Sequence, residues 1–227
     1  MDAPAILEEA RRWDERHAAP LARAVAPHAN DRTPERRLRV GYVSPDFRHH
    51  ANSHFFLPLI AEHEHERFEI FCYASVAAPD DLTEGTRRHA DHWRDIAPLD
   101  DAGAAAVIRE DRIDVLVDLA MHAKSGRPAL FARKPAPVQI AWRAVGRAGV
   151  GQAMNLTLPE LVARTPDEYV AIAVRLAQDL DRLEGLRRGL RPRMEKSPLM
   201  DAPRFARGIE RAYREAWGRW CASSSRA

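Results

Sequence analysis

Over the first 142 residues, short apolar runs alternate with amphipathic stretches, and this alternation predicts strands joined by helices. The predicted strands are residues 38–43, 68–73, 113–119 and 138–142, with a further short strand at 92–96. Between the first two, Phe55, Phe56, Leu59 and Ile60 recur at helical spacing, so a helix over 52–64 is predicted to bury them. The pattern favours an α/β fold with a parallel sheet.

The flanking segments have a different pattern. Residues 4–24 form an amphipathic stretch typical of a helix, and 27–37 form a polar linker. Beyond residue 142 the pattern is helical throughout: Thr165 is predicted to cap one helix that runs to about residue 183, and Asp201 to cap the last one. The last helix carries a stripe of Phe205, Ile209, Tyr213 and Trp217 that needs burial. The predicted parts are therefore 1–37, 38–142 and 143–227.

Composition adds little beyond a globular class. With 45% hydrophobic and 30% charged residues, the 227-residue chain has the composition of a soluble domain. No apolar run approaches the roughly 20 residues that a bilayer span needs, and residues 1–4 lack signal-peptide features. Cys72 and Cys221 are interpreted as isolated thiols, which favours a cytoplasmic location. The net charge is +2 and the late arginines are interspersed with acidic residues, so neither nucleic acid nor membrane is an expected partner.

Candidate chemistry gathers where the first predicted strand ends. In a parallel sheet, loops at the carboxyl ends of the strands line the ligand crevice. The turn there contains Asp46, His50 follows it, and His54 lies one helical turn further on. An imidazole at this corner can accept a hydroxyl proton or donate to a phosphate or sugar oxygen. For each residue a structural interpretation stays open: a solvated loop histidine, an Asp46 that bonds its own backbone, and a His54 on the helix surface.

A second group follows the strand 113–119. Asp118 lies at its end and His122 just beyond it, so both are predicted to face the same crevice. A carboxylate in that position is often a helix cap or loop anchor instead. Histidines are also dense at His49-His50, at 63–65 and at 89–92, but none of these groups has the spacing of a dedicated zinc site, and no metal is predicted.

Four ordered motifs resemble the bacterial form of the O-linked N-acetylglucosamine (O-GlcNAc) transferase / SPINDLY family. They are Leu-Arg-Val-Gly-Tyr-Val-Ser-Pro-Asp-Phe at 38–47 with His50 and Ser53-His54, Arg-Phe-Glu-Ile-Phe-Cys-Tyr at 67–73, Ile-Asp-Val-Leu-Val-Asp-Leu-Ala at 113–120 with His122, and Arg-Lys-Pro-Ala-Pro-Val-Gln-Ile-Ala-Trp at 133–142. The resemblance implies catalytic roles for His50 and His122, and substrate-binding roles for Asp46, His54 and Asp118. His122 matches the histidine of the family's Gly-His-Thr motif, although Met121 and Ala123 replace its neighbours.

The resemblance also implies a two-lobed glycosyltransferase whose first lobe is a parallel-sheet, Rossmann-like α/β domain. Such an enzyme moves N-acetylglucosamine from UDP-GlcNAc to Ser or Thr hydroxyls of a protein or peptide, with no cofactor. After Trp142, however, residues 143–169 resemble the very end of the family's catalytic region. The chain is therefore predicted to be a first lobe plus an all-helical remnant of the second, with impaired activity. The alternative is a non-catalytic remnant that serves as a scaffold or protein-binding module. In either case the last helix is predicted to pack on the first lobe.

Overall fold

The computed structural model describes residues 3–22, 25–120, 123, 125–141 and 148–223. Their contacts divide the chain into two compact units. The first unit combines Met1–Arg143 with Ile209–Ala227, and the second is Ala144–Gly208. The first unit is therefore built from two separate stretches of the chain.

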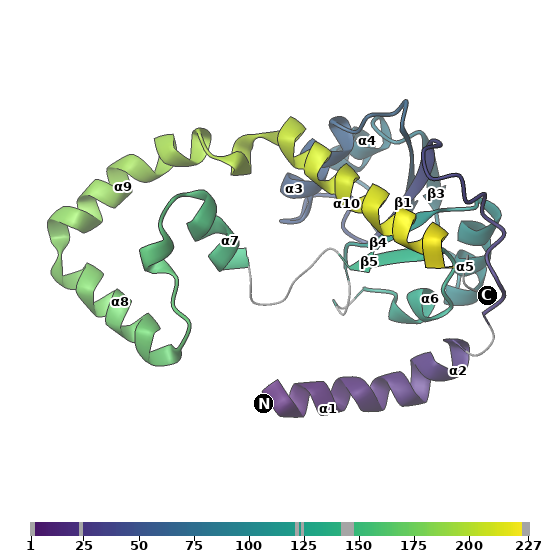
Figure 1. The fold of residues 1–227 in the computed structure, drawn as a ribbon, viewed down its shortest axis with the longest axis horizontal. Helices are drawn as coiled ribbons and strands as arrows, with labels where there is room; N and C mark the ends of the chain where they lie inside the picture. Colours follow the sequence, from purple (N-terminus) through teal and green to yellow (C-terminus); the bar gives the residue numbers. More distant parts are fainter. Residues whose placement is uncertain (1–2, 23–24, 121–122, 124, 142–147, 224–227) are drawn as a thin grey trace. The chain divides into compact units, whose positions relative to one another are not determined.

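A five-stranded parallel sheet forms the centre of the first unit (Figure 1). Its strands are β1 (Leu38–Ser44), β2 (Phe68–Ala74), β3 (His92–Asp95), β4 (Val115–Asp118) and β5 (Val138–Ala141). They lie in the order β3-β2-β1-β4-β5, and every neighbouring pair is parallel. The predicted α/β class and the predicted strands are confirmed, and only strand ends move by a residue or two.

The helices of the first unit follow the predicted order with changed bounds. They are α1 (Ala3–Trp13), α2 (Ala19–Ala22), α3 (Ser53–Ala61), α4 (Asp81–Arg87), α5 (Asp101–Glu110), α6 (Pro128–Ala132) and the latter part of α10 (Ala202–Ser223). The single helix predicted over 4–24 is wrong in detail, because a π-helical turn, η1 (Asp14–Ala18), separates α1 from α2.

The two faces of the sheet have different cores, because neighbouring residues of a strand point to opposite sides. On one face Val43 belongs to a buried cluster with Ile108 of α5 and Leu130 of α6. On the other, the Tyr42 ring lies 4.9 Å from Phe56 of α3, between ring centroids. The prediction that Phe55 is buried is wrong: its side chain is 58% exposed, because it lies about 100° around the helix from Phe56.

The part of α10 from Ile209 onward packs on the Tyr42 face, so the prediction that the last helix packs on the first lobe holds for this part. Trp217 is fully buried, and its ring centre lies 4.8 Å from the Arg36 guanidinium. Arg214 donates from Nη1 to the carbonyl oxygens of Pro34 and Arg36, both at 2.8 Å. The predicted stripe begins later than expected, since Phe205 is 37% exposed.

A buried polar network joins α10 to the sheet. His63, just beyond α3, lies between Tyr42 Oη at 2.7 Å from Nε2 and Glu210 Oε1 at 2.9 Å from Nδ1. The Glu64 main-chain N–H also donates to Glu210 Oε1, and the Tyr213 hydroxyl donates to Tyr42 Oη at 3.1 Å. Burial raises the pKa of both tyrosine hydroxyls, so each stays protonated. The hydroxyls, imidazole and carboxylate of this network therefore all have partners, whereas the buried Arg214 Nε and Trp217 Nε1 on the same helix have none among the described residues.

The second unit is helical and has a thin core. It contains α7 (Ala148–Asn155), the 3-10 turns η2 (Pro159–Leu161) and η3 (Pro198–Met200), α8 (Pro166–Gln178), α9 (Leu180–Glu195) and the start of α10. Thr165 caps α8 as predicted, but the helix ends at Gln178 and not near residue 183, because Asp179 caps α9 through the Arg182 N–H at 3.0 Å.

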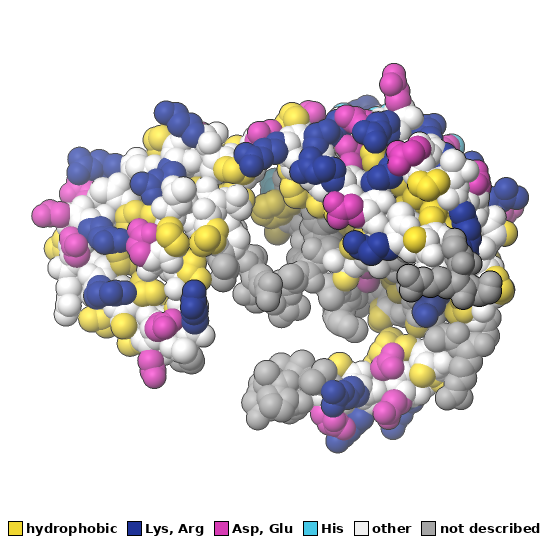
Figure 2. Space-filling view, viewed as in Figure 1, with side chains coloured by type: hydrophobic (Ala, Val, Ile, Leu, Met, Phe, Trp, Pro, Cys, Tyr) yellow, Lys and Arg dark blue, Asp and Glu magenta, His cyan; other side chains and the backbone are white. Residues whose placement is uncertain are grey.

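Few side chains of this unit are covered. Among its described residues only Leu158, Ser197 and Ala206 are buried, and Tyr169 and Leu180 are largely exposed. Figure 2 shows hydrophobic side chains interspersed with charged ones over α8 and α9. Across the described ranges of the chain, no helix combines the length and the apolar character required to span a bilayer.

Candidate active site

The candidate site lies where the strand order reverses. The chain passes from β1 outward through β2 to β3, then returns to place β4 and β5 on the other side of β1. The carboxyl ends of β1 and β4 are therefore adjacent at the switch point, where open α/β sheets bind ligands. The predicted site residues occupy the loops that follow these two strands.

His50 is held by the loop after β1. Its carbonyl oxygen accepts the Ser53 N–H at 3.0 Å, which closes a tight turn. Its Nδ1 lies 3.2 Å from the Asn52 main-chain nitrogen and 3.4 Å from Asp46 Oδ2. The side chain is 35% exposed, against 12% for Asp46. The structure thus brings the predicted Asp46 and His50 together and leaves the imidazole partly accessible.

Asn52 belongs to this site and was missed as a functional residue. The sequence indicated it only as a possible start of α3. It does occupy the N-cap position, but its side chain caps no N–H of the helix. Its Nδ2 instead reaches Asp46 Oδ2 at 3.3 Å and, at a long 3.5 Å, the Leu119 carbonyl oxygen beyond β4. An N-cap asparagine just after an Asp-x-x-x-His turn is the only sequence signal for this bridge.

The other predicted site residues differ in their placement. Asp118 is buried and accepts the Ala120 N–H at 2.9 Å, so it anchors the loop after β4. His54 is exposed on the first turn of α3. His122 lies outside the described residues, as does the end of the predicted strand at Trp142. Of the five predicted site residues, Asp46 and His50 are in direct contact.

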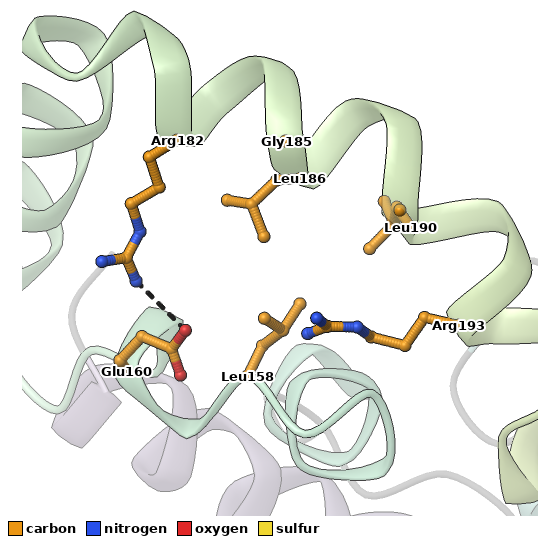
Figure 3. A pocket seen from close by; sticks show the side chains of 8 residues that line it. Leu158, Glu160, Arg182, Gly185, Leu186, Leu190 and Arg193 are labelled. Carbon is orange, nitrogen blue, oxygen red and sulfur yellow. Dashed lines mark hydrogen bonds and ion pairs between the residues drawn. The ribbon is translucent and has the colours of Figure 1, made fainter.

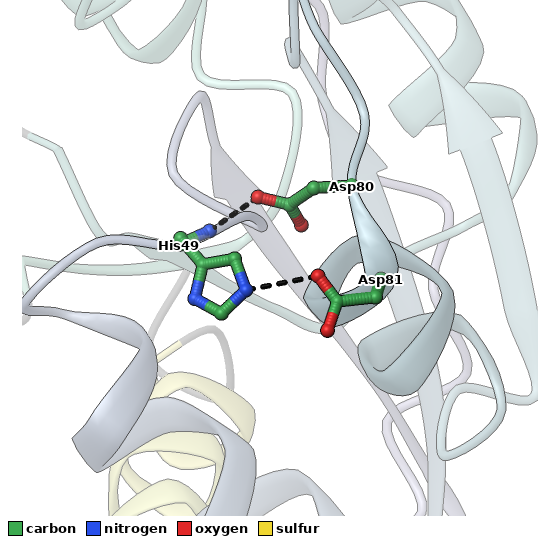
Figure 4. Close-up of side chains that lie close together, drawn as sticks. All are labelled: His49, Asp80 and Asp81. Atoms are coloured by element: carbon green, nitrogen blue, oxygen red, sulfur yellow. Dashed lines mark hydrogen bonds and ion pairs between the residues drawn. The ribbon is translucent and has the colours of Figure 1, made fainter.

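His49, in the same loop, forms a cluster with two aspartates at the start of α4. His49 Nε2 is 2.9 Å from Asp81 Oδ1, and the His49 N–H donates to Asp80 Oδ2 at 2.7 Å (Figure 4). One ligand atom from each residue lies within 4.8 Å of the others, a spacing that would suit a transition metal. Asp80 is also the N-cap of α4, and the His49 N–H holds the pKa of its carboxyl below the ordinary range. We interpret the cluster as a loop anchor.

Other histidines that are close in sequence do not share a site. His63 is buried in the α10 network, whereas His65 Nδ1 faces Asp91 Oδ2 at 2.9 Å on the surface. His92 Nε2 lies 2.9 Å from Glu69 Oε1, while His89 is exposed at the end of α4. The histidines of these groups are close in the sequence, but they do not point to a common site.

A well-formed cavity lies elsewhere, within the second unit (Figure 3). It is a partly open pocket of about 340 Å³, lined by leucines, two glycines of α9, Arg182, Arg193 and Glu160. Its carboxylate is already paired, because Arg182 Nη2 donates to Glu160 Oε1 at 3.1 Å. Its lining includes no histidine, serine or cysteine that would act as a base or nucleophile, so the candidate chemistry stays at the β1–β4 switch point.

Comparison with known proteins gives one consistent result. The sequence profile of glycosyl transferase family 41 matches residues 20–149, more than half of the chain. A probable UDP-N-acetylglucosamine–peptide N-acetylglucosaminyltransferase SPINDLY from Petunia hybrida is 29% identical over 187 residues, covering 79% of this chain and 19% of that protein. A second probable UDP-N-acetylglucosamine–peptide N-acetylglucosaminyltransferase, SEC from Arabidopsis thaliana, is 35% identical over 141 residues. The match covers 60% of this chain and 14% of that protein.

Solved structures show the same fold. An O-GlcNAc transferase mutant, K341M, from Thermobaculum terrenum superimposes with a TM-score of 0.84 at 22% identity, covering 94% of this chain and 74% of that one. Of the two curated relatives described above, the chain covers only about a seventh to a fifth of the length.

Proposed function

Since the chain belongs to glycosyl transferase family 41, we propose that its β1–β4 switch point serves the transfer of N-acetylglucosamine from UDP-GlcNAc to Ser or Thr hydroxyls of a protein or peptide. In this proposal His50 contacts the donor, and Asp46 and Asp118 shape the crevice. By resemblance to the family, His122 is a second catalytic residue and His54 binds substrate. Neither metal, cofactor, nucleic acid nor membrane has a part in it.

One observation carries the proposal. His50 is a partly exposed imidazole at the switch point, and its orientation is set by Asp46 and the turn that ends at Ser53. A pre-oriented histidine in a ligand crevice suits proton transfer or hydrogen bonding to a sugar or phosphate oxygen. A cytoplasmic location belongs to the same proposal, supported by the free thiols of Cys72 and Cys221.

The proposed activity of this shortened chain is weak. By its resemblance to the family, the chain lacks most of a second lobe that would hold the uridine diphosphate. The first lobe would then supply only part of the contacts to the donor. A non-catalytic binding module is the second candidate, favoured by the largely exposed apolar residues of the second unit.

Calorimetric titration with UDP tests the two candidates. We expect the wild-type chain to bind UDP weakly, and His50→Ala to lower the affinity by about tenfold, the equivalent of about 1.4 kcal/mol. His89→Ala is the matched control, because His89 is also an exposed histidine but is far in the sequence from the turn that ends at Ser53. We expect the His89→Ala variant to bind UDP with the affinity of the wild type.

Two results would change the conclusion. A wild-type chain that shows no heat of UDP binding at millimolar ligand would reject the transferase proposal and leave the binding module. Robust turnover of UDP-GlcNAc by the chain alone, abolished in His50→Ala, would show that the first lobe suffices and that the activity is not weak.

A further inference from the structure

His50 has two possible partners that compete for the same ring nitrogen. The Asn52 main-chain N–H, a donor, lies 3.2 Å from Nδ1, and the Asp46 carboxylate, an acceptor, lies 3.4 Å from it. In a neutral imidazole, one nitrogen carries the proton and the other accepts. Nδ1 can therefore satisfy only one of these partners at a time.

The two choices leave different chemistry at Nε2. If Nδ1 accepts from Asn52, the proton lies on Nε2, and His50 offers an N–H to the crevice. If Nδ1 instead donates to Asp46, Nε2 keeps a lone pair and can take a proton from a hydroxyl group. No described residue bonds to Nε2, so this nitrogen is the one available to a ligand.

The geometry favours the first choice. Asn52 N–H is a fixed donor, because the His50 carbonyl bonds the Ser53 N–H and the Asn52 carbonyl bonds the Phe56 N–H, at 3.0 Å each. Asp46 Oδ2 is beyond the usual 2.7–2.9 Å of a charge-assisted N–H···O bond and already accepts from Asn52 Nδ2 at 3.3 Å. Asn52 thus supplies a donor to His50 and occupies the competing acceptor.

We propose that Asn52 is a positioning residue that holds neutral His50 in the Nε2–H form, so that His50 acts on its ligand as a hydrogen-bond donor to an anionic oxygen, such as that of a phosphate, and not as a base. The assignment rests on the proposed function for the identity of that ligand. The tautomer itself is a property of the chain without ligand.

The tautomer is measurable by NMR on the full chain with ¹⁵N-labelled histidine. The spectra are recorded at pH 9, more than two units above the pKa of about 6.5 of an imidazole in a model peptide, where such an imidazole is neutral. Long-range ¹H–¹⁵N spectra then distinguish the protonated from the unprotonated ring nitrogen, and His50→Gln identifies the His50 signals among the ten histidines. We expect the His50 proton on Nε2.

Two variants at one position isolate the main-chain donor. Asn52→Pro removes the N–H, and its ring suits the φ of −64° at this residue. Asn52→Ala loses the same side chain but keeps the N–H. We expect the His50 proton to move to Nδ1 in Asn52→Pro and to stay on Nε2 in Asn52→Ala. Asp46→Asn, which weakens the competing acceptor, should leave the wild-type tautomer unchanged.

A wild-type proton on Nδ1 would overturn the proposal, and so would identical His50 tautomers in the Pro and Ala variants. If Asn52→Pro does not fold, the wild-type and Asp46→Asn spectra decide. Addition of UDP to the same samples separates this inference from the proposed function. If the His50 proton lies on Nε2 and the spectra do not respond to UDP, the transferase proposal is rejected and the inference stands. If the proton lies on Nδ1 and the spectra respond to UDP, the inference is rejected and the transferase proposal stands.

Discussion

Replacement of Trp217 by alanine tests whether the last helix holds the first unit together. The indole is fully buried, with the Arg36 guanidinium 4.8 Å from its ring centre and the Trp220 ring at the same distance. Truncation of a buried aromatic typically costs about 3 to 5 kcal/mol, because it removes buried surface and leaves a cavity. The cation–π contact accounts for about 0.5 to 2 kcal/mol of that cost.

The assay is thermal and urea unfolding followed by circular dichroism. At roughly 2 to 4 °C per kcal/mol for a chain of this size, Trp217→Ala should lower Tm by about 6 to 20 °C. Trp217→Phe should cost clearly less, because it keeps a ring and removes an indole N–H that has no acceptor among the described residues. Trp220→Ala, at a half-buried position, is the matched control. Equal losses for Trp217→Ala and Trp220→Ala would refute the reasoning.

Two further predictions concern the sheet. Gly41→Ala should destabilise the chain by about 1 to 3 kcal/mol in urea unfolding, because a Cβ at Gly41 would lie 2.9 Å from Tyr73 Cε2; a change below 0.5 kcal/mol would contradict the close packing. Burial alone would raise the pKa of Asp91, but the Ile70 N–H and His65 lower it overall. Asp91→Asn should therefore lose stability at pH 7, and its deficit relative to wild type should shrink as pH falls below about 4; a pH-independent deficit would be the contrary result.

The sheet was predictable because its signals are local. Apolar runs bounded by turn residues mark β1 and β2 within a few residues of their bounds. The pair Asp46 and His50 was also within reach, since both lie in one short turn. Phe55 was placed wrongly because α3 is continuously apolar from Phe55 to Ala61, and such a run does not reveal which of its residues faces the sheet.

The remaining parts of the site depend on contacts that are distant in the sequence. The Asn52 amide reaches Leu119, 67 positions away, and His63 meets Glu210 across 147 positions. Neither pairing leaves a mark in local composition or periodicity. His63 and His65 are two residues apart, yet in the segment after α3 one points into the α10 network and the other lies on the surface.

The division of the first unit between two stretches of chain bears on how the protein is made. Ribosomes add about 5 to 20 residues per second, so the 65 residues Ala144–Gly208 take roughly 3 to 13 seconds to synthesise. During that interval the sheet is complete in sequence, yet the Tyr42 face lacks α10. A nascent chain stalled before Ile209 exposes an apolar surface in which His63 Nδ1 lacks Glu210 and Tyr42 Oη lacks the Tyr213 hydroxyl. The interval is therefore the period when a chaperone has most to protect.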